Sequence, residues 1–359
     1  MFHSILVPLD GSPFAEHALP LALGIGRRAD ASVELLQAHG LYALREPACA
    51  WLPFDPALDD ACRQEEIAYL QGVVGRLAAT VPLTTAVVNG LPSDAILERV
   101  GQLNADLIVM TTHGRGPLSR AFLGSVADEV LRGSEVPVLL IRPRQEAIDL
   151  KSDALPRRVL IPLDGSALSE QILLPALDLV RLAGARCTLL HVVEPGWLFG
   201  ASEEQARRAE EVRSYLDALA APLRAEGMAI ETHVADDGPT VATILEVAEA
   251  HDLVALATHG PGGLRRLLLG SVADKLVRAA TTPILTYARK PSESRSGRRS
   301  EIRDQKRGSG SDLRPRRAHL WLSVRSLRPL EIVHETAVIP RPERHRESSH
   351  SERSEPQRG

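Results

Sequence analysis

Two stretches of this sequence occur twice, and the duplication constrains the fold more than any other feature. ILVPLDGS at residues 5–12 returns as VLIPLDGS at 159–166, DLIVMTTHG at 106–114 returns as DLVALATHG at 252–260, and LGSVAD stands at both 123–128 and 269–274. Between Thr111 and Arg132, 13 of 22 positions are identical to their counterparts. An offset of 146 to 154 residues is too long for a solenoid unit and has the size of a domain. The sequence predicts two tandem copies of one domain.

The predicted organisation is a first domain at 1–145, a linker at 146–156, a second domain at 157–290 and a tail at 291–359. A length of 359 residues and an apolar content of 44% are sufficient for two separate cores. From residue 289 onwards there are 18 Lys and Arg against 10 Asp and Glu, whereas the remainder of the chain is acidic. Because this tail is rich in Arg, Ser, Pro and Gly, we expect it to be basic, dispensable for folding and ligand binding, and disordered apart from an apolar segment, HLWLSVRSLRPLEIV, at 319–333.

Short apolar runs alternate with amphipathic segments in each copy. The runs predicted as strands are 4–9, 31–38, 83–88, 106–111 and 136–141 in the first copy, and 158–163, 186–193, 229–234, 252–257 and 283–287 in the second. The segments predicted as helices in the first copy are 16–29, 59–79, 93–102 and 125–132. This alternation predicts an α/β protein with two tandem open parallel five-stranded sheets, each covered by helices on both faces.

A Pro-Leu-Asp-Gly-Ser loop follows the first strand of each copy. It places Asp10, and in the second copy Asp164, at the carboxyl end of a strand, where ligands bind in open parallel sheets. A carboxylate there can accept a hydrogen bond from an exocyclic amine. The alternative interpretation is purely structural, because Asp-Gly-Ser is also typical of a turn followed by a helix cap.

A second loop, after the fourth strand, contains two glycines separated by nine residues and then a serine. In the first copy these are Gly114, Gly124 and Ser125. Glycine allows backbone amides to approach an anion closely, and the start of the following helix favours phosphate. A flexible loop before a helix start is the structural alternative, but recurrence of the spacing in both copies favours phosphate binding.

These motifs resemble those of the universal stress protein family, in its tandem two-domain form, over nearly all of the chain outside the tail. The resemblance implies a flavodoxin-like fold of the adenine nucleotide alpha hydrolase type and one ATP site in each domain, with Mg²⁺ as a companion ion. Asp10 and Asp164 would contact adenine, and Ala38 and Val192 would line the base pocket. The full set of residues expected at the nucleotide is Pro8, Leu9, Asp10, Ala38, Met110, Thr111, Gly114, Gly124, Ser125 and Val126 in the first domain, and Pro162, Leu163, Asp164, Val192, Leu256, Ala257, Gly260, Gly270, Ser271 and Val272 in the second.

The sequence departs from the family's nucleotide-binding pattern at one glycine in each copy. Thr111 and Ala257 stand where the first glycine of Gly-x2-Gly-x9-Gly-Ser is expected. Three functions therefore remain open: a nucleotide-binding stress-response regulator, a nucleotide-free interaction module, and a slow ATPase. The first is our prediction, because no P-loop, pyrophosphatase loop or synthetase signature is present and neither glycine loop gathers a lysine and a base.

A histidine stands directly before the first glycine of each glycine loop. His113 and His259 are expected to brace their loops rather than act as bases. Three cysteines without metal-ligand spacing predict neither a zinc site nor disulfides, and no apolar run has the length of a membrane span. We therefore expect a cytoplasmic protein without membrane partners, whose folded domains do not bind nucleic acid. Its last strands, 136–141 and 282–287, are expected to meet in an intramolecular pseudo-dimer, and further homodimerisation is left open.

Overall fold

Parallel strands and helices alternate along the chain in the order that the sequence predicts. The computed structural model describes residues 2–40, 55–77, 81–113, 123–144, 148–150, 154–193, 203–235, 238–258, 270–287 and 332–339. The elements of the first half are β1 (Ser4–Leu9), α1 (Leu19–Ala29), β2 (Ser32–His39), α3 (Pro56–Arg76), β3 (Leu83–Asn89), α4 (Pro92–Leu103), β4 (Leu107–Thr111), α5 (Ser125–Gly133) and β5 (Val138–Ile141). Those of the second half are β6 (Arg158–Pro162), α6 (Leu173–Ala183), β7 (Arg186–Val192), α7 (Glu203–Ala225), β8 (Ile230–Ala235), α8 (Thr240–Ala248), β9 (Leu253–Ala257), α9 (Ser271–Ala279) and β10 (Ile284–Tyr287).

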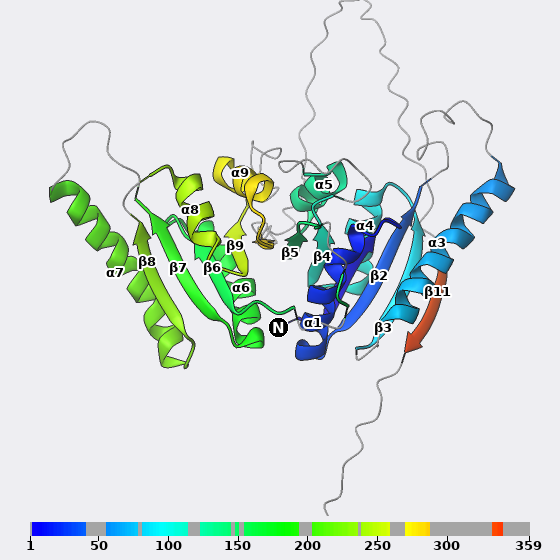
Figure 1. Cartoon of the computed structure of the whole chain (residues 1–359), viewed down its shortest axis with the longest axis horizontal. Helices are drawn as coiled ribbons and strands as arrows, with labels where there is room; N and C mark the ends of the chain where they lie inside the picture. Colours follow the sequence, from blue (N-terminus) through cyan, green and yellow to red (C-terminus); the bar gives the residue numbers. More distant parts are fainter. Residues whose placement is uncertain are drawn as a thin grey trace, which may run out of the picture.

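Each half contains a five-stranded parallel sheet whose strand order reverses beside its first strand. The order in the first half is β3-β2-β1-β4-β5, and in the second it is β8-β7-β6-β9-β10. Parallel pairing joins β1 to both β2 and β4, and joins β6 to both β7 and β9 (Figure 1). The carboxyl ends of β1 and β6 are therefore the switch points at which ligands of open α/β sheets bind. The predicted fold class is confirmed.

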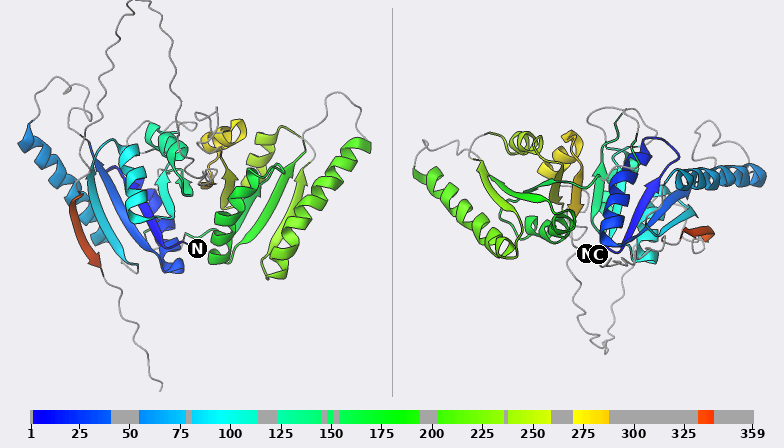
Figure 2. Two further views of the ribbon diagram at one scale, coloured as in Figure 1. Left: turned by 180° about the vertical axis from the view of Figure 1, so that it is seen from behind. Right: turned by 60° about the horizontal axis from the view of Figure 1, so that its bottom comes forward.

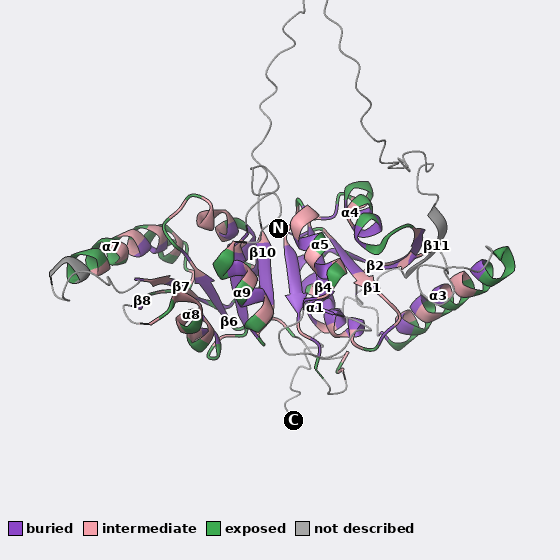
Figure 3. Ribbon diagram, turned by 90° about the horizontal axis from the view of Figure 1, so that it is seen from above, coloured by how far each residue is buried: buried purple, intermediate pink, exposed green. Residues whose placement is uncertain are grey.

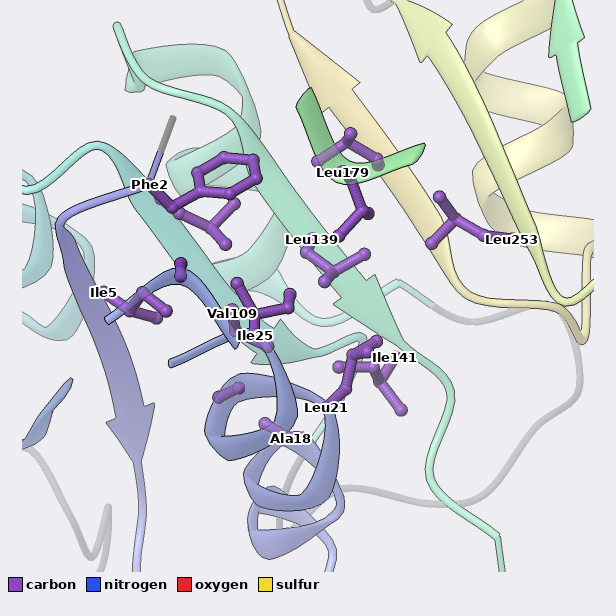
Figure 4. Packing of buried hydrophobic residues seen from close by; sticks show 14 of the residues in the cluster. Phe2, Ile5, Ala18, Leu21, Ile25, Val109, Leu139, Ile141, Leu179 and Leu253 are labelled. Atoms are coloured by element: carbon purple, nitrogen blue, oxygen red, sulfur yellow. The ribbon is translucent and has the colours of Figure 1, made fainter. Parts of the chain in front are cut away.

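Helices cover both faces of the sheets, because alternate strand residues are apolar on both sides. Ile5 and Val7 of β1 belong to a buried cluster with residues of α1 and α3, whereas Leu6 belongs to a second cluster with residues of α4 and α5. Viewed from above, buried strands run between helices whose outward faces are exposed (Figure 3). Near the middle of the molecule, Leu139 of the first half lies toward Leu179 and Leu253 of the second, within one buried cluster (Figure 4).

The two sheets join into one through their last strands. β5 and β10 pair in antiparallel orientation, with Leu139 opposite Leu285. Below this pair, α1 lies beside α6, and Nε of Arg28 donates to the carbonyl oxygen of Leu182 at 3.3 Å (Figure 2). The apolar edge strand of each half is thus covered by the other half.

One further strand lies in the tail that the sequence predicts to be disordered. β11 (Ile332–Ile339) pairs in antiparallel orientation with β3, with Thr336 opposite Thr85, and lies on the outer edge of the first half (Figures 1 and 2). It extends the sheet to eleven strands among the described residues. Other tail residues lie outside the described ranges. The signal for β11 was present in the sequence, since IVHETAVI is rich in β-branched residues.

Candidate functional site

A pocket of about 270 Å³ opens at the switch point of the second half. Its walls come from the loop after β6, the ends of β7 and β9, and the first turns of α8 and α9. The predicted site residues among its lining are Pro162, Leu163, Asp164, Val192, Leu256, Ala257, Gly270, Ser271 and Val272. These are all the predicted residues of this half except Gly260, which lies outside the described residues. The fold therefore brings residues more than 100 positions apart in the sequence into one pocket.

The Asp164 loop forms one wall as a tight hydrogen-bonded turn. Gly165 adopts a φ of 78°, a conformation that favours glycine, and Oδ1 of Asp164 accepts from the backbone N–H of Ser166 at 2.9 Å. Partial loss of water around Asp164 favours its neutral form, but hydrogen bonds from Ser166, Ser169 and the loop backbone outweigh this effect and hold the pKa of the carboxyl below its usual value. Asp164 is therefore an ionised acceptor at neutral pH.

The first turn of α9 forms the opposite wall. Gly270 is the residue before the helix, and its carbonyl accepts from the N–H of Asp274 at 2.9 Å. Ser271 and Val272, at the first two helical positions, are exposed at the pocket. Backbone N–H groups of a first helical turn have no partner within the helix and attract anions. The pocket thus combines an acidic acceptor, apolar lining from Leu163, Leu256 and neighbours, and an anion-attracting helix start.

Several lining residues were not predicted from the sequence. They are Ser166, Leu168, Ser169, Leu190, Thr240, Ile244, Ala273 and Leu276. Ser166 and Thr240 could have been found, because Ser166 belongs to the repeated Asp-Gly-Ser motif and Thr240 directly follows Gly238-Pro239. The apolar members gave no signal distinct from that of ordinary core residues.

In the first half, the predicted residues lie at the corresponding edge of the sheet. Pro8, Leu9 and Asp10 end β1 and begin its loop, Ala38 stands near the end of β2, Met110 and Thr111 end β4, and Gly124, Ser125 and Val126 begin α5. Oδ1 of Asp10 accepts from the N–H of Ser12 at 2.9 Å, and Gly11 has a φ of 83°, as in the second half. Gly114 lies outside the described residues. The structural interpretation of Asp-Gly-Ser as a turn is therefore correct for both copies, and the turn itself presents the carboxylate at the switch point.

Gly124 has a structural role in addition to the phosphate contact expected for it. Its φ of −61° and ψ of 151° are accessible to any residue, so no unusual backbone conformation requires glycine. Its N–H donates to the carbonyl oxygen of Thr112 at 2.8 Å, and an added Cβ would lie 3.1 Å from that oxygen. Glycine at this position allows α5 to start against the end of β4.

The two residues that replace the family's first glycine occupy different environments. Thr111 is buried at the end of β4, whereas Ala257 is half-buried and lines the pocket of the second half. With alanine in this wall the pocket still has a volume near the lower end of the ~300–1,000 Å³ typical of small-molecule sites. The alanine therefore leaves an open pocket in the second half.

His113 contacts its neighbour Thr112, and the loop that it is expected to brace lies outside the described residues. Its Nδ1 and Oγ1 of Thr112 are 3.0 Å apart, and Nε2 is buried with no hydrogen-bond partner in the described part of the chain. Burial, and then the positive charge of Arg142, lower the pKa of His113 below its usual value. The imidazole is therefore neutral at pH 7. His259 and the arginines of both glycine loops lie outside the described residues.

A buried charged cluster beside the first site was not anticipated. Nδ1 of His39, at the end of β2, is 2.7 Å from Oε2 of Glu66, and its Nε2 is 3.1 Å from Oδ1 of Asp59. Arg63 also bonds to Asp59, at 3.3 Å. Val193 occupies the position of His39 in the second copy, so the cluster belongs to the first half alone. Within the described ranges, no group of three or more acidic, His or Cys side chains is arranged to hold a metal.

A comparison with known protein families agrees with the duplicated motifs and with their position at the carboxyl-terminal edge of each sheet. The model of the universal stress protein family matches residues 1–142 and 156–287. The chain belongs to the universal stress protein family. The matched segments correspond to the two predicted copies. Within the described residues, no helix has the combination of length and apolar character needed to cross a membrane.

Similar universal stress proteins occur in mycobacteria. One from Mycolicibacterium smegmatis is 26% identical over 293 residues, covering 79% of this chain and 96% of that protein. One from Mycobacterium tuberculosis is 31% identical over 190 residues, covering 50% of this chain, and the matched stretch spans only 61% of that relative's length. Among solved structures, a universal stress protein from Archaeoglobus fulgidus superposes with a TM-score of 0.63 at 22% identity, covering 80% of this chain and 98% of that one, and thus shares the fold.

Proposed function

We propose that this universal stress protein binds adenine nucleotide, with ATP as the ligand, and acts as a stress-response regulator whose conformation or partners depend on the bound ligand. The observation that carries the proposal is the pocket of the second half, which gathers every described residue of one predicted nucleotide site. It lies at a switch point of a parallel sheet, where this class of fold binds ligands.

The chemistry of the lining fits a nucleotide. Asp164 would accept a hydrogen bond from the adenine amine, apolar side chains such as Val192 and Leu163 would contact the base, and the α9 start with Ser271 would hold phosphate. Mg²⁺ would accompany the phosphates, since it neutralises their charge and the described lining offers no cationic side chain. The corresponding residues of the first half would form a second site.

The pocket favours binding over catalysis. Asp164 is the one charged side chain in the described lining, and no lysine or second carboxylate accompanies it. Phosphoryl transfer depends on such groups to position the nucleophile and stabilise charge. We therefore propose a non-enzymatic regulator, with slow ATP hydrolysis as a minor alternative. We also propose that the protein is cytoplasmic.

The two halves of the chain have separate roles in this proposal. The β5–β10 pairing would take the place of an interface between two subunits. Because both halves belong to one chain, the protein would be an intramolecular pseudo-dimer. The buried Thr111 favours a second candidate function for the first half, a nucleotide-free interaction module, because its side chain stands where the family pattern has glycine.

Titration calorimetry of ATP, together with mass spectrometry of any co-purified nucleotide, tests the proposal. Val272→Asp is the informative variant: the side chain is 37% exposed at the pocket, and an acidic residue in a first helical turn favours the helix while repelling phosphate. Leu174→Asp is the matched control, at the same helical position of α6, 68% exposed and outside the described pocket lining. We expect lost or weakened binding only for Val272→Asp. No binding by the wild type would favour the interaction module.

A further inference from the structure

Arg142 connects the first half to a helix of the second. It directly follows β5 and is half-buried. Its Nη2 donates to the carbonyl oxygen of Arg278 at 2.6 Å and to that of Val277 at 3.3 Å. Both carbonyls belong to the last turn of α9, the helix whose first turn lines the pocket of the second half.

The contact satisfies groups that the helix cannot satisfy itself. The last four carbonyls of an α-helix have no intrahelical donor, and a cation at this end interacts favourably with the helix dipole. Since α9 runs only from Ser271 to Ala279, about 13 Å at 1.5 Å per residue, fixing its end also constrains its start. Arg142 therefore acts on the pocket wall from the opposite end of the helix.

A second contact ties α9 to the first half. Nη2 of Arg278 lies 3.8 Å from Oδ1 of Asp128 on α5, and its Nε bonds to both carboxylate oxygens of Asp274 at 3.0 Å. Asp128 in turn accepts two bonds from Arg132 at 2.8 and 2.9 Å. The two helices that begin at the two candidate sites are thus linked by charged side chains across the junction.

The sequence does not repeat Arg142 at the equivalent position of the second copy. Alignment of the repeats pairs Ile141 with Tyr287, so the counterpart of Arg142 is Ala288, whose methyl side chain has no hydrogen-bond donor. The duplicated halves therefore differ at this point: the first supports a helix of the second, and alanine replaces the arginine that would return the support.

We propose that Arg142 is a positioning residue for the pocket of the second half, which makes that pocket a product of both halves. It acts through α9 and touches no ligand. The dependence therefore runs in one direction. The second site requires Arg142 of the first half, whereas the first site does not require Arg142. The effect on ATP rests on the proposed function, whereas the effect on α9 does not.

Hydrogen exchange of the full chain without nucleotide tests the support directly. Arg142→Met keeps an apolar side chain of similar length and removes the donors, and Arg142→Lys keeps the charge without the guanidinium fork. We expect amide exchange in 271–279 to accelerate by roughly tenfold in Arg142→Met, less in Arg142→Lys, and not at all in 125–133. Arg158→Met, which removes only an exposed 3.7 Å ion pair with Asp252, is the control and should leave both helices unchanged.

ATP titration provides the second measurement. In an Asp10→Ala background, which reports the second site, Arg142→Met should weaken binding by roughly five- to tenfold, and in an Asp164→Ala background it should have no effect. Unchanged exchange in α9, or equal acceleration in both helices, would overturn the positioning role. Absence of ATP binding by the wild type would refute the proposed function, and exchange in α9 would still decide the role of Arg142.

Discussion

Asp164 combines two tasks in one carboxylate. Oδ1 closes the turn by accepting from Ser166, and the ionised group faces the pocket. Asp164→Ala removes both functions, so we expect ATP affinity at the second site to fall by about 1–3 kcal/mol once the nucleotide excludes water. Asp164→Asn retains an acceptor oxygen for the turn and should lose less. Calorimetry measures the ATP affinities, which should decrease from wild type to Asp164→Asn to Asp164→Ala. Equal affinities of the alanine variant and the wild type would contradict the role of Asp164.

We expect His113 to lower the stability of the protein in acid. Because burial and Arg142 lower its pKa in the folded state, the unfolded chain binds the proton more readily, and stability falls as pH decreases through the usual histidine value of about 6.5. His191, whose pKa burial also lowers, should contribute in the same direction. We expect His113→Gln to flatten the dependence of Tm on pH between about 7 and 5, leaving the part due to His191. Parallel curves of Tm against pH for His113→Gln and the wild type would contradict the contribution of His113.

At the scale of elements, the start of α5 depends on a close approach to β4. In Gly124→Val the Cβ would lie 3.1 Å from the carbonyl oxygen of Thr112, with two methyl groups beyond it. We expect a loss of about 1–3 kcal/mol in the free energy of unfolding. Gly101→Ala is the control, since no atom lies within 4 Å of its added Cβ and alanine favours the helix by up to ~1 kcal/mol. In denaturant unfolding, the free energy of unfolding should be lower than that of the wild type for Gly124→Val and higher for Gly101→Ala.

A buried ion pair fixes α4 to the sheet of the first half. Nε and Nη2 of Arg99 donate to the two carboxylate oxygens of Glu34 on β2, at 2.6 and 2.8 Å. Arg99→Met would leave a buried carboxylate uncompensated and should cost about 3–5 kcal/mol. The double variant Glu34→Met/Arg99→Met should recover most of this loss in denaturant unfolding. A double variant as unstable as the single one would show that packing, rather than charge, dominates.

The elements were predictable because their signals are local. Runs such as SILVPL follow from apolar periodicity, which neighbouring residues determine. The gathering of nine predicted residues in one pocket followed partly from the repeat and the switch-point rule and partly, as for Val192, from the resemblance to the universal stress protein family. Contacts such as Glu34 with Arg99 and His39 with Glu66 could not be predicted, because each depends on the relative placement of two elements, and a charged residue on a helix is ordinarily solvated.

At the scale of the molecule, the duplicated halves have diverged in how they treat their outer edges. On β8, Glu231 and His233 supply polar side chains, and Nε of Arg224 donates to the carbonyl oxygen of Ile230 at 2.9 Å. β3, LTTAVVN, has no charged residue, and β11 pairs along it instead. Charged side chains and covering segments are two ways of preventing edge-to-edge association. The second half therefore protects its edge strand β8 with polar and charged side chains, and the first half covers its edge strand β3 with β11 of the tail.

This difference predicts the consequence of shortening the tail. A chain ending at residue 331 loses β11 and exposes the uncharged edge of β3, so we expect it to self-associate as its concentration rises, through pairing of β3 edges. A chain ending at residue 344 retains β11 and should behave like the full protein. Because β3 is the strand farthest from β6 and the second pocket within the first half, ATP affinity at that pocket should be the same in all three chains. Sedimentation velocity over a concentration series measures the association, and a monomeric 331-residue chain would show that β3 needs no cover.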